Sequence, residues 1–221
     1  MSDDSFFREV DQEMRQDRAK ALWDRYGPAA IALAVAVVLA TAAWVAWDYW
    51  TQSQANQSGD DYSQALTLAR EGRTEEAKAA FEQLEADGYG AYPVLARMRA
   101  ATLLAEEGDH AGAIAAFDEV SSDGSVPQSI RDMAALRAAL LLVDHGSYED
   151  VSARVEALVA ETNALRHSAR EALGLSAWKH GRMEDASALF GQILDDEGAP
   201  RNMRQRAELM SELIRGSGSS S

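Results

Sequence analysis

An uncharged, apolar run from Ala29 to Trp47 constrains this chain more than any other feature of its sequence. It follows Pro28 and reads AAIALAVAVVLATAAWVAW, in a chain that elsewhere is rich in Asp, Glu and Arg. At about 1.5 Å of rise per residue, a helix over this run is roughly 28 Å long, which nearly matches a bilayer hydrocarbon core of about 30 Å. The run therefore predicts one transmembrane helix, within a membrane segment over residues 28–50.

Aromatic residues flank the run on both sides. The amphipathic rings of Trp and Tyr prefer the headgroup level of a bilayer, and a buried helix of a soluble domain has no need of such belts. We therefore expect five of them to lie at the two membrane interfaces: Trp23, Tyr26, Trp44, Trp47 and Trp50.

A cleaved signal peptide is the main alternative to a permanent span. The tripeptide Ala40-Thr41-Ala42 resembles a small-residue cleavage site. However, the leader before the run, residues 1–27, is longer and more acidic than the n-region of a signal peptide, and the run exceeds the usual h-region. The sequence thus favours an uncleaved signal anchor.

Positive residues near the span set its expected orientation. After the span, the first basic residue is Arg70, which is too distant to count. Five basic residues precede it, namely Arg8, Arg15, Arg18, Lys20 and Arg25. The positive-inside rule then places the N-terminus in the cytoplasm and residues 51–221 on the other side, which for a bacterial inner membrane is the periplasm.

The leader, residues 1–27, is predicted to form an amphipathic helix that is capped by Ser5 and ends at Gly27 and Pro28. Its apolar residues recur at helical spacing: Phe6, Phe7, Val10, Met14, Leu22 and Trp23. Such a helix either lies on the membrane surface, docks on a cytoplasmic partner, or is a solvated juxtamembrane helix. The solvated helix is favoured, because the acidic residues oppose binding to an anionic leaflet.

The rest of the chain predicts one helical domain with polar borders. Residues 51–60 read as a linker, residues 61–215 are long enough to build a core, and residues 216–221 read as a flexible tail. The chain has no Cys, so no disulfide framework or thiolate metal site is expected. Residues 51–221 carry 16 Lys and Arg against 28 Asp and Glu, a net charge of -12, which disfavours nucleic acid as a partner.

Four blocks of this domain align with one another. Each starts with a turn glycine, followed by a small or β-branched residue five positions later and a large apolar residue nine positions later. The glycines, separated by 36, 38 and 35 residues, are Gly72, Gly108, Gly146 and Gly181. The later positions hold Ala77 and Phe81, Ala113 and Phe117, Val151 and Val155, and Ala186 and Phe190. One helical face is repeated four times, which predicts an all-α stack of helix hairpins.

Each block has the physical features of a helix hairpin. The glycine is expected to take a left-handed conformation that ends the first helix, and acidic residues suit the positive end of the second. Pro93, Pro127 and Pro200 mark where the chain turns back after three of the second helices. The third block lacks both the Phe and the Pro, so we expect it to be the least regular.

This spacing resembles the tetratricopeptide repeat, although the first helices lack the usual early Trp and the prolines come later. Together with the single span and the leader sequence FREVDQEMRQDRAKALWDRYGP, it makes the chain similar to the YfgM-like family, the ancillary subunit of the SecYEG translocon, from Ser5 to about Arg215. The resemblance implies a single-pass inner-membrane protein with periplasmic tetratricopeptide-like repeats. It also implies association with the Sec channel and with a membrane-anchored periplasmic prolyl isomerase and chaperone. Two other functions stay open: an adaptor for cell-wall or outer-membrane assembly, and a direct chaperone for unfolded periplasmic proteins.

The first helices of stacked hairpins line the concave side of the stack, where partners bind. Counting back from the turn glycines places six residues toward this groove: Met98, Thr102, Leu136, Leu140, Leu175 and Trp178. The leucines have an alternative role in packing against neighbouring helices. Trp178 is the best candidate for an exposed aromatic anchor.

No motif predicts catalysis. The sequence contains neither a phosphate-binding loop nor a nucleophile elbow. Glu106 and His110 are four residues apart, but Gly108 between them is expected to end the helix, so we expect no metal pair there. The acidic run at residues 195–197 lacks the spacing of a calcium loop. We therefore expect a protein that is not an enzyme and has no cofactor, no metal and no small-molecule substrate.

Overall fold

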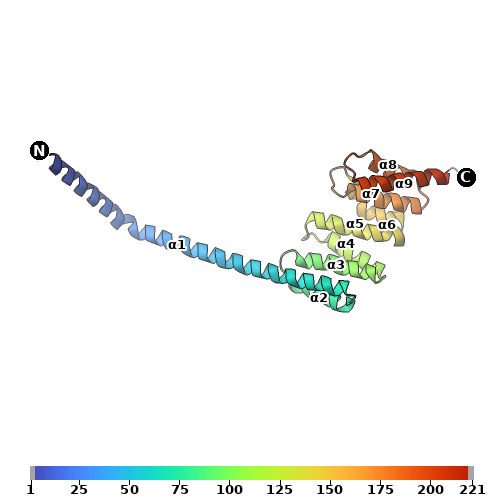
Figure 1. Ribbon diagram of the computed structural model, residues 1–221, viewed down its shortest axis with the longest axis horizontal. Helices are drawn as coiled ribbons and strands as arrows, with labels where there is room; N and C mark the ends of the chain where they lie inside the picture. Colours follow the sequence, from blue (N-terminus) through green and yellow to red (C-terminus); the bar gives the residue numbers. More distant parts are fainter. Residues whose placement is uncertain (1–2, 219–221) are drawn as a thin grey trace. The chain divides into compact units, whose positions relative to one another are not determined.

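The computed structural model describes residues 3–218, and every regular element in that range is helical (Figure 1). The chain divides into two compact units, Met1–Asn56 and Gln57–Ser221. The predicted all-α class, with a long apolar N-terminal helix and a stack of helix hairpins, is confirmed.

The first helix, α1, spans Asp3–Arg70 without interruption. The predicted helix end at Gly27 and Pro28 is wrong, because Pro28 lies inside the helix, where a proline is tolerated at the cost of one backbone hydrogen bond. Residues 51–60, predicted as a linker, are also helical. Gly59 has the lowest helix propensity of these residues, and the division between the two units falls after Asn56.

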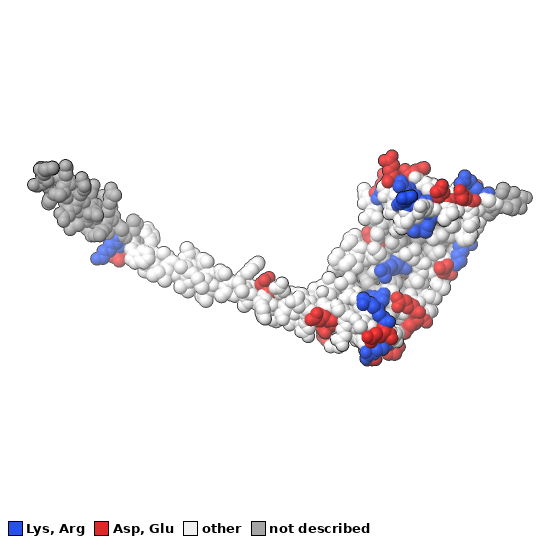
Figure 2. Space-filling model, viewed as in Figure 1, with Lys and Arg blue, Asp and Glu red and all other residues white. Residues whose placement is uncertain are grey.

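The apolar part of α1 is uncovered by protein. By length and composition this part is able to cross a membrane once, and its most apolar window is 0% buried. Figure 2 shows it as an uncharged stretch. The five aromatic side chains predicted for the interfaces range from 50% exposed at Trp50 to 76% at Trp44, the others being Trp23, Tyr26 and Trp47. Exposed apolar surface of this extent is compatible with a helix that faces lipid.

The second unit is a stack of helix hairpins in chain order (Figure 1). The end of α1 is its first helix, because Ala65 shares a buried cluster with residues of α2 and α3. Each later helix packs against its predecessor or the next hairpin. The remaining elements are α2 (Thr74–Asp87), α3 (Tyr92–Glu106), α4 (His110–Ser122), α5 (Gln128–His145), α6 (Tyr148–Val155), the 3-10 turn η1 (Glu156–Val159), α7 (Arg166–Lys179), α8 (Met183–Asp195) and α9 (Arg201–Gly218).

The repeated positions form the core of each hairpin. The side chains five and nine residues after each turn glycine are at most 2% exposed, as the spacing predicts: Ala77, Phe81, Ala113, Phe117, Val151, Val155, Ala186 and Phe190. A third repeated position escaped the sequence analysis. Seven residues before each turn glycine lies a buried small residue of the first helix: Ala65, Ala101, Ala139 and Gly174. A Cβ added at Gly174 would lie only 2.9 Å from Cζ of Phe190, so the two helices meet at this point.

Three of the four turn glycines take the predicted left-handed conformation. The φ angles are 76° at Gly72, 89° at Gly108 and 74° at Gly181, a region that side chains with a Cβ rarely adopt. The prediction is wrong for Gly146, whose backbone is extended at φ -134° and ψ -173°.

The third hairpin is the least regular, as expected. Its second helix, α6, has only eight residues and continues as the 3-10 turn η1. In place of a left-handed glycine, Lys179 of α7 caps the C-terminus of α5. Its Nζ donates hydrogen bonds to the carbonyls of Val143 (3.1 Å) and Asp144 (2.9 Å), which lack an intrahelical donor. Ser147 and Asp150 then form a capping box that starts α6.

Prolines mark the start of the returning helices, as predicted. Pro127 is the N-cap of α5 and Pro200 directly precedes α9. Pro93 is the second residue of α3. The missing N–H of proline costs nothing at these positions, since the first amides of a helix have no intrahelical acceptor.

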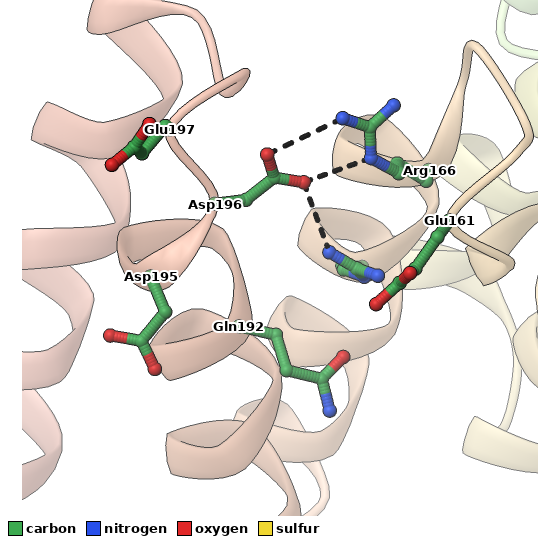
Figure 3. A pocket seen from close by; sticks show the side chains of 7 residues that line it. Glu161, Arg166, Gln192, Asp195, Asp196 and Glu197 are labelled. Carbon is green, nitrogen blue, oxygen red and sulfur yellow. Dashed lines mark hydrogen bonds and ion pairs between the residues drawn. The ribbon is translucent and has the colours of Figure 1, made fainter.

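Arginine–aspartate pairs fasten the loops between hairpins. Arg97 of α3 binds Asp123, in the loop after α4, at 2.8 Å. Asp196, in the loop after α8, accepts from Nε of Arg166 at 2.9 Å (Figure 3). Nε2 of the buried His167 lies 2.8 Å from the same carboxylate. Each pair ties the first helix of a hairpin to the loop that follows its second helix.

These contacts lower the pKa of both carboxyl groups. The hydroxyl of Ser125 and then the Arg97 guanidinium lower the pKa of Asp123 from 3.8 to about 2. The Arg166 guanidinium and then His167 hold the pKa of Asp196 far below its usual range. Both carboxylates are therefore charged in the folded protein at all but strongly acidic pH.

The contact between Gly174 and Phe190 generates a first prediction. We expect Gly174→Ala to lower the free energy of unfolding by about 1 to 2 kcal/mol, because overpacking outweighs the gain in helix propensity. Gly191→Ala is the matched control, since a Cβ there meets nothing within 4 Å. It should raise the stability by about 0.5 to 1 kcal/mol. Urea unfolding of the full chain in detergent, followed by circular dichroism, measures both. Equal stabilisation by the two substitutions would contradict a close helix approach at Gly174.

The Asp196 cluster generates a prediction about pH. Because the pKa of Asp196 is lower in the folded than in the unfolded chain, its stabilisation is complete above about pH 5 and is lost as the pH falls toward 2. We expect Asp196→Asn to lower the Tm at pH 7 by about 3 to 6 °C and to flatten the fall of Tm with acid. Asp195→Asn, next to it but without an ion pair, should leave both unchanged. Parallel Tm curves for the Asp196→Asn and unsubstituted chains would refute the assignment.

Candidate partner-binding groove

A groove of about 360 Å³ lies between the first helices α3 and α5, beside the end of α1. We call it the α3–α5 groove. Its lining residues are Tyr62, Leu95, Met98, Arg99, Thr102, Ser129, Ile130, Met133 and Arg137. Two residues of the predicted concave surface, Met98 and Thr102, are therefore brought together in one hollow.

The other four predicted residues do not line this groove. Leu136 is 4% exposed and belongs to the core around α5, α6 and α7, so its assignment to a partner surface is wrong. Leu140 is exposed on α5. Leu175 and Trp178 are half-buried, and both pack against the core formed by α7, α8 and α9. A partner contact by Leu140, Leu175 or Trp178 stays a prediction.

Repeat geometry explains why Leu136 is buried while Met98 lines the groove. Tyr62, Met98, Leu136 and Glu171 all lie ten residues before a turn glycine. In the irregular third hairpin, the core of α6 and α7 covers Leu136. In the fourth hairpin the same position is the acidic Glu171, which binds Arg206 at 2.6 Å. The lining of the α3–α5 groove therefore comes from the first helices of the first three hairpins, and Leu136 is not part of it.

Four groove residues that were not predicted from the sequence carry its chemistry. Leu95 and Met133 each lie thirteen residues before a turn glycine, and Arg99 and Arg137 each lie nine before. Leu95 and Arg99 share one face of α3 with Met98 and Thr102, so helical spacing on that face would have predicted them as well. The positions of the four residues on neighbouring first helices bring them together across the groove.

The α3–α5 groove contains two guanidinium groups, those of Arg99 and Arg137, beside its apolar side chains. Nη1 of Arg99 is 3.6 Å from Glu106, and its buried Nε has no acceptor among the described residues. Nη1 of Arg137 donates to the hydroxyl of Thr102 at 3.1 Å, with its guanidinium 6.0 Å from the Phe117 ring centre. Both cations keep free donors. The groove is therefore suited to an extended polypeptide segment that carries apolar and acidic side chains.

The histidines of the described part of the chain contact other protein groups at helix ends and loops. The rings of His110, at the start of α4, and His145, at the end of α5, stack with centroids 3.9 Å apart. Nδ1 of His180 lies 2.8 Å from the carbonyl oxygen of Ser176. Among the described side chains, no group of three His, Asp or Glu is arranged to hold a metal ion.

Comparison with known proteins agrees with this architecture. A family model described as tetratricopeptide repeat-like domain matches residues 20–207, from within α1 to within α9. No curated protein and no solved structure matches the chain at a significant level. Repeats of this class are protein-interaction folds, built by stacking hairpins around extended binding surfaces. Since the match covers most of its length, the chain belongs to the tetratricopeptide repeat-like family.

Proposed function

We propose that the protein is a single-pass inner-membrane scaffold whose α3–α5 groove holds an extended segment of a partner protein. The observation that carries the proposal is the groove itself. Exposed apolar side chains and two cations with free donors meet on neighbouring first helices of a repeat fold that serves protein interaction. The exposed apolar stretch of α1 supports a membrane anchor, because it has no protein cover.

We further propose that the scaffold is an ancillary subunit of the SecYEG translocon. Its partners would then be the channel and a membrane-anchored periplasmic prolyl isomerase, and it would link Sec-dependent export to periplasmic chaperones. The resemblance from Ser5 to about Arg215 supports this role, since it covers the leader, the span and the repeats together.

The proposed topology has the N-terminus in the cytoplasm and the repeats in the periplasm. We expect a reporter that is active only in the periplasm to work when fused after Arg215 and to fail when fused before Phe6, because the basic residues precede the span. N-terminal sequencing should find the leader intact. A soluble periplasmic product that starts near Ala43 would show instead that the apolar run is a cleaved signal.

A second prediction tests the groove. Met133 and Met183 are both 37% exposed, but only Met133 lines the α3–α5 groove. We expect Met133→Glu to reduce the Sec subunits that copurify with the full chain from mild detergent by about tenfold, since it places a charge among the apolar contacts. Met183→Glu is the matched control and should change the yield by less than about twofold.

The same purification separates the alternatives. Equal yields from the two methionine variants would show that partners use another surface. Copurification of cell-wall or outer-membrane assembly proteins without Sec subunits would favour the adaptor function. Suppression of client aggregation by the purified full chain, without copurified partners, would favour a direct chaperone.

A further inference from the structure

The last described helix, α9, carries a basic groove on an acidic protein. The groove measures about 410 Å³ and lies along α9 next to the end of α8. We call it the α9 groove. Its lining residues are Leu194, Arg201, Arg204, Gln205, Glu208, Ser211 and Arg215. Three arginines thus share one hollow in a chain whose net charge is -15.

These three arginines differ from most others in the repeat unit, because none of them pairs with a carboxylate of a described residue. Arg215 donates through Nε only to the carbonyl of Ser211, at 3.2 Å. Eight other arginines lie within 4 Å of a carboxylate oxygen: Arg73, Arg97, Arg99, Arg154, Arg166, Arg170, Arg182 and Arg206. Acidic residues are abundant in this protein, and Glu208 lines the same groove, yet no carboxylate of a described residue lies within 4 Å of a guanidinium nitrogen of these three arginines.

Two of the three cations also oppose the helix dipole. Arg201 is the first residue of α9 and Arg204 lies one turn further on. Cations are disfavoured at the positive end of a helix, and α2, α6 and α8 begin with acidic residues instead. The arrangement costs stability in the isolated chain, and an anion bound at this helix end would offset that cost.

The fourth hairpin shows how an arginine at this position can be neutralised, whereas Arg131 in the third hairpin contacts the neutral Gln128. Arg204 lies four residues after Pro200, as Arg131 lies four after Pro127, and Arg131 and Arg166 each lie fifteen residues before a turn glycine. Arg204 is therefore the counterpart of Arg166. Arg166 receives the carboxylate of Asp196, from the loop thirty residues further along (Figure 3). No described residue gives Arg204 the equivalent carboxylate.

We propose that the α9 groove binds an acidic segment of a partner protein. Carboxylates of this segment would pair with Arg201 and Arg204, as the carboxylate of Asp196 pairs with Arg166. A polypeptide fits this groove better than a lipid surface for two reasons. Glu208 lies between Arg204 and Arg215 and repels a continuous anionic surface, whereas a peptide can place a neutral residue opposite it. Leu194, 36% exposed in the wall, offers an apolar contact for a side chain.

The length of the α9 groove sets the length of the segment that it can hold. At about 1.5 Å per residue, Arg201 and Arg215 are roughly 21 Å apart along α9, the span of about six or seven extended residues.

This surface is distinct from the α3–α5 groove. Its arginines lie on α9, whereas the α3–α5 groove is formed by the first hairpins of the stack. The two sites therefore allow the scaffold to hold two segments at once, and loss of one does not entail loss of the other.

The probe for the test is a fluorescent peptide that copies residues 192–200, QILDDEGAP, the loop that binds Arg166. Its control has Asn, Asn and Gln in place of the three acidic residues. Fluorescence anisotropy with the full chain in a non-ionic detergent should show binding of the acidic peptide at low salt, weakened by added salt, and at least about tenfold weaker binding of the control peptide.

Variants of the chain locate the site. We expect Arg201→Gln together with Arg204→Gln to weaken binding of the acidic peptide by about tenfold. Arg70→Gln is the matched control, since Arg70 is exposed and has no carboxylate partner among the described residues but lies outside the groove. It should change binding by less than about twofold. The double variant should keep or slightly raise the Tm, because it removes cations from a helix N-terminus.

Several results would overturn the proposal. Equal binding of the acidic and neutral peptides, or equal weakening by the double variant and by Arg70→Gln, would show that the groove does not select carboxylates. A fall in Tm of several degrees in the double variant would assign the arginines a structural role. Phosphatidylglycerol adducts that depend on Arg201 and Arg204, without peptide binding, would assign the groove to lipid headgroups. A dimer that dissociates in the double variant, seen by sedimentation, would assign it to a second copy of the chain.

Discussion

The close approach of two helices within each hairpin is the constraint on which the rest of the structure depends. A residue seven positions before the turn glycine is small, and a ring or branched side chain nine positions after the glycine packs on it, as Gly174 and Phe190 do. Neither helix buries its apolar face alone, so hairpins must stack to complete the core. The stacking in turn brings first helices next to one another, which creates the α3–α5 groove.

Ion pairs add contacts between the loops and the helices of this apolar stack. Asp123 and Asp196 each fasten a loop to the first helix of their hairpin. The Ser125 hydroxyl and then Arg97 lower the pKa of Asp123, and Arg166 and then His167 lower the pKa of Asp196, so both carboxylates stay charged. Arginines that take part in such pairs have fewer donors left for a ligand. Arg99 and Arg137 in the α3–α5 groove keep free donors beside their contacts with Glu106 and Thr102, and the three arginines of the α9 groove have no carboxylate partner among the described residues. The distribution of carboxylates therefore decides where an acidic protein can bind an acidic partner.

The irregular third hairpin shows how local sequence changes the binding surface. Gly146 is extended, α6 is short, and Lys179 takes over the capping of α5. Leu136 is then covered by the core of α6 and α7, at a position where Met98 of the second hairpin remains accessible. The groove thus includes the N-terminal part of α5, but not Leu136, which the irregular hairpin buries.

The sequence by itself determined the apolar helix, the number of aligned blocks, the buried positions after each turn glycine and the irregularity of the third block, because spacing alone decides which side chains share a helix face. It also located Met98 and Thr102. It misplaced the helix ends near Pro28 and at residues 51–60, since neither a lone proline nor a polar composition is enough to end a helix within a long helical run. The burial of Leu136, the pairing of Asp196 with Arg166 and His167, and the unpaired state of Arg201 and Arg204 were decided only by the tertiary structure. Each depends on which distant element covers a side chain or brings a charge to it, and a spacing within one helix carries no information about that distance.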